Sequence, residues 1–467
     1  MARTGTAAAV LGAVLVLAVA GLAACSPSPG DPFTVRWARP MSGPSEQDEI
    51  DGVAAGRDGS VFVTGKFERS TAIGGRTLTS AGAADIPFAR FDAAGRPLWA
   101  QRFGGTGEDN LFDVDGAPAG GAVGTGWFEG TVRFGGVTLT SAGASDCVIV
   151  SVADDGSVRW ARALGGPRRD GCNEVTVTAD GSVVTSIDTE GGWTPPGLTP
   201  IAPLSGPDTL LVRLRPDGTP QWLRRVGGPG AQRGKSLAVA PDGSIVFGGD
   251  TRGELRPGGA VLPMRGTGRD AWFGRWSAAG SLQWAKLWGG PGDDIVKGLA
   301  TDGARIYAVG SFTGTVDVGG ATLSAGTGDD LAVVRFAPDG SLVWATSVTA
   351  TSSLLGAEVV TAPDGGVLFG GTRAAGMRFR PASGTPVPLD EQDGGIGWLA
   401  AYRPDGSVAF ARTIAGTVEG RPGELARRGQ RLFIDVVLRG SGNTGAGTPL
   451  PTAGKDASVW AIDLASK

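Results

Sequence analysis

The stretch Leu98–Asp109, LWAQRFGGTGED, recurs along the chain with a tryptophan, a basic or polar residue and a Gly-Gly turn in the same order. Close variants begin at Val158 (VRWARALGGPRRD), Pro220 (PQWLRRVGGPG) and Leu282 (LQWAKLWGGPGDD). The anchor positions of all units are Trp37, Trp99, Trp160, Trp222, Trp284 and Trp344, with Phe410 in the same context. Successive anchors are 62, 61, 62, 62, 60 and 66 residues apart, and such a regular period indicates tandem structural units.

Each unit contains signals for four short antiparallel strands. The first two strands are joined by an Asp-Gly turn, a strong hairpin signal, in most units: Asp58-Gly59, Asp180-Gly181, Asp242-Gly243, Asp302-Gly303 and Asp364-Gly365. A connection of roughly 20 residues leads to a third strand, and a tight turn such as Asp155-Gly156 leads to the strand that carries the anchor. Four-stranded sheets repeated around an axis are the blades of a β-propeller, whose strands are named a to d from the centre outward.

The predicted strands at the two ends of the sequence together make up one blade. Cutting before each a-strand leaves six whole blades and a C-terminal remainder of three strands that begins at GELARRGQ. The missing d-strand is the segment FTVRWARP, residues 33–40, at the other end. We therefore predict an all-β fold: a seven-bladed β-propeller whose N-terminal strand pairs with the three C-terminal strands, which leaves no exposed sheet edge in that blade. The propeller domain spans residues 33–467.

Three short elements of the repeat resemble the SBBP-type seven-bladed propeller repeats of secreted and surface bacterial proteins. They are G-G-x-G-x-D (GGTGED), V-x-V-T-G (VFVTG) and x-D-x-x-G-x-x-x-W (FDAAGRPLW). The resemblance covers about residues 33–467, is weak in the unit from Phe410, and Ile396 stands where a c-strand Asp is expected. It implies the fold and export from the cytoplasm, and it implies no particular reaction.

The N-terminus predicts lipid anchoring. Arg3 precedes an uncharged apolar run from Ala7 to Ala24, which is typical of a secretory signal. The segment LAAC that ends at Cys25 resembles the lipobox of bacterial lipoproteins. That resemblance implies removal of residues 1–24, acylation (palmitate) of Cys25, and a tether over residues 25–32. We expect a lipoprotein of the bacterial cell envelope, at the outer membrane. An uncleaved anchor, or a plain signal peptide with a chance cysteine, is the alternative.

Composition excludes several classes of function. The chain has no histidine, which removes the commonest general base and most transition-metal sites. Its formal charge of −4 and lack of basic runs argue against a nucleic-acid surface. Cys147 and Cys172 could pair in an exported protein. The predicted fold places their strands at different radii, however, and this argues against a disulfide.

Three sets of recurring residues are candidates for a binding site. The anchor tryptophans are expected to pack between blades, because seven equivalent copies on an outer strand are too many for one ligand site. An Asp opens the c-strand 14 residues before the anchor and is expected to accept backbone N–H groups: Asp85, Asp146, Asp208, Asp270 and Asp330, with Asp456 as the sixth. Paired carboxylates in two d–a loops could hold Ca²⁺: Glu108, Asp109, Asp293 and Asp294. Other units carry Arg169, Gln232 and Arg233 there, so no common metal site is expected.

The predicted function is a non-catalytic binding scaffold that acts as a monomer. The b–c and d–a connections share one face, which we expect to bind a protein or polysaccharide ligand and to look away from the membrane. A carboxylate-based polysaccharide lyase or hydrolase is the competing interpretation, and an outer-membrane assembly lipoprotein or a quinoprotein are others. Tyr307 and Tyr402 fall within strands, which does not favour an enzyme. No cofactor is expected apart from the possible Ca²⁺.

Overall fold

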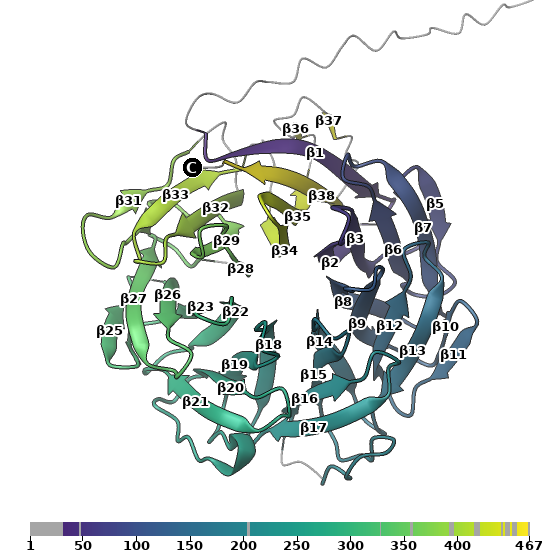
Figure 1. Cartoon of the computed structure of the whole chain (residues 1–467), viewed down its shortest axis with the longest axis horizontal. Helices are drawn as coiled ribbons and strands as arrows, with labels where there is room; N and C mark the ends of the chain where they lie inside the picture. The colour runs from purple at the N-terminus through teal and green to yellow at the C-terminus, as the bar shows by residue number, and fades with distance from the viewer. Residues whose placement is uncertain are drawn as a thin grey trace, which may run out of the picture.

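The structure is a computed structural model of the chain. It describes residues 31–465 except 46–47, 203–205, 327, 355–357, 392–396, 415–420, 440–441, 444–448 and 451–454. The predicted signal peptide, Cys25 and most of the tether lie outside the described residues. Within the described residues, seven antiparallel sheets of four to six strands lie around a common centre, and two further sheets have two strands each (Figure 1).

Six blades are formed from consecutive segments of chain. The first two are β2(Glu49–Ala55), β3(Val61–Lys66), β6(Ile86–Phe91), β7(Pro97–Gly105), and β8(Asp109–Gly116), β9(Ala122–Phe128), β12(Asp146–Val152), β13(Val158–Leu164). The next two are β14(Asp170–Val177), β15(Val183–Thr189), β16(Asp208–Leu214), β17(Pro220–Val226), and β18(Gln232–Val239), β19(Ile245–Thr251), β20(Asp270–Trp276), β21(Leu282–Trp288). The last two are β22(Ile295–Thr301), β23(Ile306–Phe312), β26(Asp330–Phe336), β27(Leu342–Thr349), and β28(Val359–Thr361), β29(Val367–Thr372), β32(Gly397–Tyr402), β33(Val408–Thr413).

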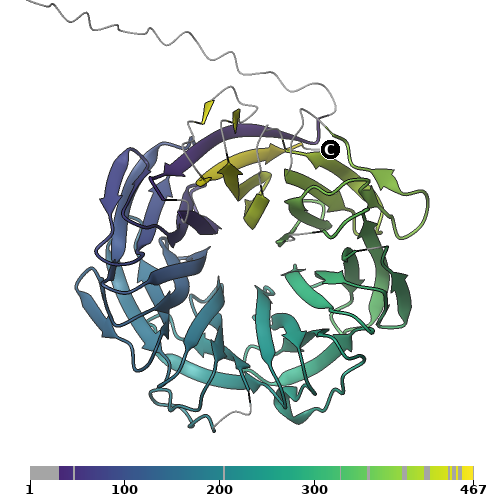
Figure 2. The same ribbon diagram turned by 180° about the vertical axis from the view of Figure 1, so that it is seen from behind.

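The seventh blade joins the two ends of the chain. Its order is β34(Arg421–Arg428), β35(Arg431–Arg439), β38(Lys455–Leu464) and β1(Phe33–Ser42). β1 runs antiparallel to β38, with Phe33 opposite Leu464 and Met41 opposite Ala457. Both views show these two strands side by side (Figures 1 and 2). The predicted seven-bladed β-propeller, closed by its N-terminal strand, is confirmed.

The b–c connections are more ordered than the sequence indicated. Several form small hairpins, and these pair with the d-strand of the preceding blade rather than with their own. β4(Ser70–Ile73) pairs with β1, β10(Thr131–Phe134) pairs with β7, and β30(Arg378–Phe379) pairs with β27. The partner strands β5(Arg76–Thr79), β11(Val137–Thr140) and β31(Val387–Pro388) lie at the outer rim (Figure 1). A similar hairpin is formed by β24(Thr315–Val318) and β25(Ala321–Ser324), and a further short pair by β36(Gly442–Asn443) and β37(Pro449–Leu450). These hairpins therefore tie neighbouring blades together and lie away from the centre.

The anchor tryptophans fasten each blade to the next. The indole Nε1 of six anchors donates a hydrogen bond of 2.9–3.2 Å to a carbonyl in the c–d turn of the following blade. For Trp222 the acceptor is Ala278, and the turn glycine Gly280 lies against the indole face, where a Cβ would stand 2.9 Å from the ring. Gly280 also has a positive φ of 79°, so two independent constraints favour glycine there. The repeated Trp and turn Gly thus form one interlocking contact.

Phe410 marks the one junction without such a turn. The blade that follows it is the closing blade, whose c-strand ends at Leu464 and whose d-strand begins at Phe33. The chain has no c–d turn there, and hence no turn carbonyl for an indole N–H. Phe410 instead lies with its ring 5.9 Å from that of Phe33. The replacement of Trp by Phe therefore follows from where the ring is closed.

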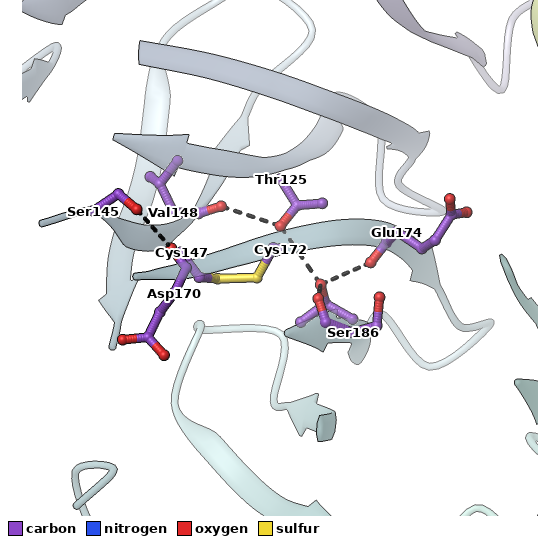
Figure 3. Close-up of a disulfide and its surroundings, with 9 residues drawn as sticks. Thr125, Ser145, Cys147, Val148, Asp170, Cys172, Glu174 and Ser186 are labelled. Atoms are coloured by element: carbon purple, nitrogen blue, oxygen red, sulfur yellow. Dashed lines mark hydrogen bonds between the residues drawn. A yellow bond between two sulfur atoms is a disulfide. The ribbon is translucent and has the colours of Figure 1, made fainter. Parts of the chain in front are cut away.

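The possible disulfide is formed: Cys147 and Cys172 are bonded, with their Cα atoms 4.9 Å apart, although their strands lie at different radii. Cys147 lies on β12, a c-strand, and Cys172 on β14, the a-strand of the next blade (Figure 3). A c-strand and an a-strand of the same blade lie at different radii, but these two cysteines belong to neighbouring blades. Neighbouring sheets pack face to face, so the a-strand of one blade lies against the outer strands of the blade before it. The disulfide is fully buried and links two blades.

The Trp contact predicts a graded loss of stability. Trp222→Phe keeps most of the ring and removes the hydrogen bond, so we expect it to cost about 1 kcal/mol. Trp222→Ala also removes the ring from a 7% exposed site and should cost about 3–5 kcal/mol. Phe410→Trp, the control, should give no gain because its turn acceptor is missing. Urea unfolding followed by tryptophan fluorescence and circular dichroism measures all three. Equal losses for Phe and Ala at position 222 would contradict the assigned hydrogen bond.

Candidate functional site

The c-strand aspartates are structural, as the sequence predicted. Asp85 Oδ2 accepts the N–H of Ala81 at 2.8 Å, and Asp330 Oδ2 accepts that of Gly326 at 2.9 Å. The carboxylates of Asp146 and Asp270 accept the N–H groups of Ala142 and Arg265 in the same way. Asp208 is held instead by an ion pair with Arg225 and by the backbone of Gly228, in the d–a loop. All five side chains are at most 2% exposed. The side chain of Asp456 lies outside what the structure describes. These residues close the end of each b–c connection and are not available to a ligand.

The carboxylates proposed for Ca²⁺ are already engaged. Asp109 and Asp294 accept backbone N–H groups four residues earlier in the chain, from Gly105 at 2.7 Å and Gly290 at 2.9 Å. Asp293 receives Nε and Nη2 of Arg269 at 3.0 and 2.9 Å. Glu108 lies 3.6 Å from Lys66. Within the described residues, no three Asp, Glu or Cys side chains form a group that could hold a metal ion. The calcium hypothesis stays a prediction.

The strongest candidate is instead the centre of the ring, where each inner strand carries the same irregularity. Six of the seven a-strands have a register shift at equivalent positions, such as Leu111/Asp113 on β8 and Gly234/Ser236 on β18. A β-bulge bends its strand and changes the direction of the side chains next to it. The bulge therefore singles out the same position in successive blades.

Each blade places one charged side chain at this level of its inner strand. In blade order these residues are Asp51, Asp113, Glu174, Lys235, Lys297, Glu358 and Glu424. We call them the inner charged ring. In three blades the residue just before the recurring apolar position is Gly or Ser (Gly52, Ser236, Gly298), and there the charged residue stands one position earlier. The inner strands thus carry five carboxylates and two ammonium groups at this level or one residue from it.

Two members of the ring have a structural role. Asp113 accepts the N–H of Val175, on the next inner strand, at 2.6 Å and its neighbour Val114 at 2.6 Å. Asp51 accepts the amide of Asn110 at 3.0 Å. These hydrogen bonds link the inner strands of adjacent blades.

The other five members have no such role. In the described part of the chain, no hydrogen bond and no ion pair within 4.0 Å involves the side chains of Glu174, Lys235, Lys297, Glu358 or Glu424. In Figure 3 the carboxylate of Glu174 points away from the disulfide that fixes its strand. A cavity of about 300 Å³ lies at the centre, and Asp113, Asp115, Glu174, Glu358 and Glu424 line it. Asp113 and Asp115 accept backbone N–H groups of the next inner strand, whereas Glu174, Glu358 and Glu424 are acidic groups that the fold does not use to link the blades.

Burial and mutual repulsion perturb these groups. Burial raises the pKa of Glu358 to about 7. Burial, and then the negative charges of Asp113 and Glu358, raise the pKa of Glu174. Burial lowers the pKa of Lys297, and the positive charge of Lys235 lowers it further. Convergent polar groups with perturbed pKa values in a central cavity are typical of a binding site.

The inner charged ring is not evident from the sequence alone, although its period is present there. Neighbouring ring residues are 61–66 residues apart, the same period as the anchors. Their identities differ between units, so a search for repeated residues passes over them. The bulge that brings them to one level is visible only in the structure.

The two tyrosines do not contribute to this cavity. Tyr307 donates its hydroxyl to the carbonyl of Gly365 at 2.9 Å, and burial raises its pKa to about 12. Tyr402 is fully buried between aromatic rings of the core. Among the residues that the structure describes, no helix is long and apolar enough to cross a bilayer.

Comparison with known proteins agrees with the fold. A family model described as a domain of unknown function (DUF5122) beta-propeller matches residues 313–342. Similar solved structures include a puromycin hydrolase (12% identity, TM-score 0.45), which aligns with 87% of this chain and of which the chain spans 54%. The Synechocystis apocarotenoid oxygenase (11%, 0.40) aligns over 90% of this chain and 92% of its own. The virginiamycin B lyase of Staphylococcus aureus (9%, 0.35) aligns over 92% and 99%.

No curated protein sequence matches the chain significantly. The chain is a β-propeller. At these identities the comparisons assign no activity, so the function is argued from the side chains.

The buried loop aspartates predict a pH dependence of stability. Burial raises the pKa of Asp294 to about 7 and that of Asp109 to about 6, from 3.8. A raised pKa favours the protonated form in the folded state, so this contribution is complete at pH 4 and is lost as the pH rises to about 7. The advantage of Asp294→Asn over the parent should therefore grow between about pH 4 and 7 and then stay constant. Thermal unfolding across that range measures it, and a constant difference would refute the assigned shift.

Proposed function

We propose that the chain is a lipid-anchored propeller of the bacterial cell envelope that binds a ligand at its centre without chemical turnover. The observation that carries this proposal is the inner charged ring. Charged groups in a cavity cost stability unless they are paired, and the three glutamates that line it, Glu174, Glu358 and Glu424, have no hydrogen bond or ion pair within the described chain. Closure of the ring does not require these charged side chains, so a binding role accounts for their presence despite the stability that they cost.

The disulfide supports an exported location. Disulfides persist in oxidising compartments and are rare in the cytoplasm, and Cys147–Cys172 is buried between two blades. This agrees with the signal-like N-terminus and the position of Cys25. The first described residues enter the propeller at the start of β1, on the face of the tight c–d turns, where Asp31 pairs with Arg412 at 2.7 Å. A lipid at Cys25 would then attach behind the ring and leave the d–a face open.

Lipid anchoring has a direct test. The full chain expressed in a bacterial host with labelled palmitate should carry the label and sediment with membranes. Cys25→Ser should lose the label and move to the soluble fraction, because stable anchoring needs the acyl chains. Cys147→Ala together with Cys172→Ala, which leaves Cys25 as the sole cysteine, should keep the label. Label that persists in Cys25→Ser would exclude this anchor.

Binding at the centre is tested by neutralising the three unpaired glutamates. The triple variant Glu174→Gln, Glu358→Gln and Glu424→Gln should lose envelope ligands that the parent retains during purification. Its matched control neutralises glutamates outside the ring: Glu129, Glu190 and Glu391. Native mass spectrometry of the three proteins measures the bound mass. Equal retention by the two triple variants would place binding elsewhere.

One observation favours a second candidate, a carboxylate-based hydrolase or lyase. The pKa of Glu358, about 7, is the value that a general acid needs near neutral pH. The same variants separate the candidates. An enzyme predicts that Glu358→Gln keeps the bound polysaccharide and stops its cleavage, whereas a scaffold predicts no cleavage by the parent.

A further inference from the structure

We infer that the closing blade carries an interaction surface of its own, which docks against the headgroups of an anionic lipid bilayer beside the point where the chain enters the ring. The inference rests on the proposed lipid anchor and specifies which part of the propeller touches the membrane. It follows from the charges of one turn, from the position of that turn next to β1, and from the short length of chain between Cys25 and Asp31.

The a–b turn of the closing blade differs in charge from the equivalent turns of the other blades. Five of those turns carry an Asp-Gly pair, and the turn of the remaining blade, residues 117–121, has no charged residue. In the closing blade, residues 427–431 (RRGQR) contain three arginines and no acidic residue. Arg428 pairs with Arg431 across the turn, and Gly429 takes the positive φ of 60° that the reversal needs. The other blades make their turns without such a cluster, so the hairpin does not call for these arginines.

This turn lies at the end of the blade where the N-terminal strand begins (Figure 1). Arg431 of β35 stands opposite Asp463 of β38, and Asp463 stands opposite Thr34 of β1, so all three share one end of the sheet. Arg36 lies two residues further along β1, with 57% of its side chain exposed, and Arg428 is exposed as well. We call Arg36, Arg428 and Arg431 the basic turn surface.

The carboxylate beside this surface does not neutralise it. Asp463 lies between two of its members and accepts Nε of Arg36 at 2.7 Å and Nε of Arg431 at 2.9 Å. One carboxylate thus faces two guanidinium groups. Within the described residues, the side chain of Arg428 makes no hydrogen bond and no ion pair within 4.0 Å. The basic turn surface therefore keeps a net positive charge that is open to solvent.

The proposed tether keeps this surface close to a bilayer. Residues 26–30 separate Cys25 from Asp31, so the Cα atoms of these two residues are at most about 22 Å apart. Asp31 is itself paired with Arg412 at 2.7 Å and does not oppose the approach. A membrane that contains anionic lipids attracts arginine side chains that come within a Debye length of about 8–10 Å. An acyl chain on Cys25 would bring the basic turn surface into that range.

The rest of the same face favours contact through the closing blade. The c–d turns of other blades carry exposed aspartates: Asp155, Asp217 and Asp339. Each accepts hydrogen bonds from the Ser or Thr two residues later, and these bonds lower the pKa of the carboxyl, so the group stays charged. An anionic membrane repels these turns and attracts the basic turn surface. The ring would thus rest on its closing blade, with the d–a face turned away from the lipid.

The test measures how close two points of the ring come to a bilayer. The full chain is purified from a bacterial host and added to vesicles of phosphatidylcholine, alone or mixed with phosphatidylglycerol, that carry a quencher on a lipid headgroup. A fluorophore is attached to one introduced cysteine, either Gln430→Cys in the basic turn or Ala279→Cys in the c–d turn of the fourth blade. Cys147 and Cys172 are bonded to each other and Cys25 is acylated in the proposed form, so the native cysteines do not take the label.

Phosphatidylglycerol should increase the quenching of the Gln430→Cys probe and leave that of the Ala279→Cys probe unchanged. The increase should vanish at about 1 M salt, where the Debye length falls to about 3 Å. Arg36→Gln together with Arg428→Gln should also remove it, because each arginine near an anionic surface contributes about fivefold to the attraction.

The matched control, Arg159→Gln with Arg215→Gln, removes two exposed arginines from the same face in the second and third blades and should behave as the parent. Thermal unfolding confirms that each variant is folded. An equal loss in the control, equal quenching of the two probes, or no effect of phosphatidylglycerol overturns the inference and leaves the anchor intact. A chain without an acyl group that floats only with the anionic vesicles supports this surface and excludes the anchor. A chain without an acyl group that floats with neither kind of vesicle overturns both.

Discussion

The structure depends on one contact, between the indole of each d-strand and the c–d turn of the next blade. A blade alone is a small sheet that cannot bury both faces, so it is stable only between neighbours. The indole supplies apolar area and one directional hydrogen bond, which sets the position of the next sheet as well as its distance. Because the turn glycine lies on the ring, a larger residue at that position would separate the blades. The contact therefore explains two repeated residues by one constraint, and it also explains why Phe410 replaces Trp where the turn is missing.

The centre follows the opposite rule. At the outer contact the residue types recur because the geometry permits little else, whereas at the inner bulge only the position recurs and the residue types vary. Asp113 still uses its carboxylate to link two inner strands, but Glu358 and Lys297 make no such bond. The residue type is thus constrained where two blades are joined, and it varies where the inner strands face the cavity. A rigid ring with a variable lining is the arrangement expected of a binding scaffold.

The same distinction decides what could be predicted from the sequence. The blade number, the strand order and the closure by residues 33–40 were predictable because period, Asp-Gly turns and anchors are local signals. The structural role of Asp85 and its equivalents was predictable from turn chemistry. The disulfide could not be predicted, because Cys147 and Cys172 come close only where two neighbouring blades pack together. The outer hairpins could not be predicted for the same reason, because they pair with the preceding blade. The inner charged ring depends on bulges, which leave no clear pattern in the residues.

The charged side chains of the inner ring reduce the stability of the fold, and this bears on their function. Glu174, Glu358 and Glu424 line the cavity without a hydrogen bond or ion pair within the described chain, and burial raises the pKa of each. A ring selected for stability alone would replace them by apolar or neutral residues, as Phe112 and Gly298 show the positions can accept. The outer contacts and the Cys147–Cys172 bridge supply stability that tolerates this arrangement. Lys235 and Lys297 stand between Glu174 and Glu358 in the ring, and each attracts the glutamate beside it. Glu424 lies on the other side of the ring and faces only negative charges, which raise its pKa further. The proposed binding role accounts for keeping acidic side chains in that part of the cavity, where the fold supplies no positive charge to balance them.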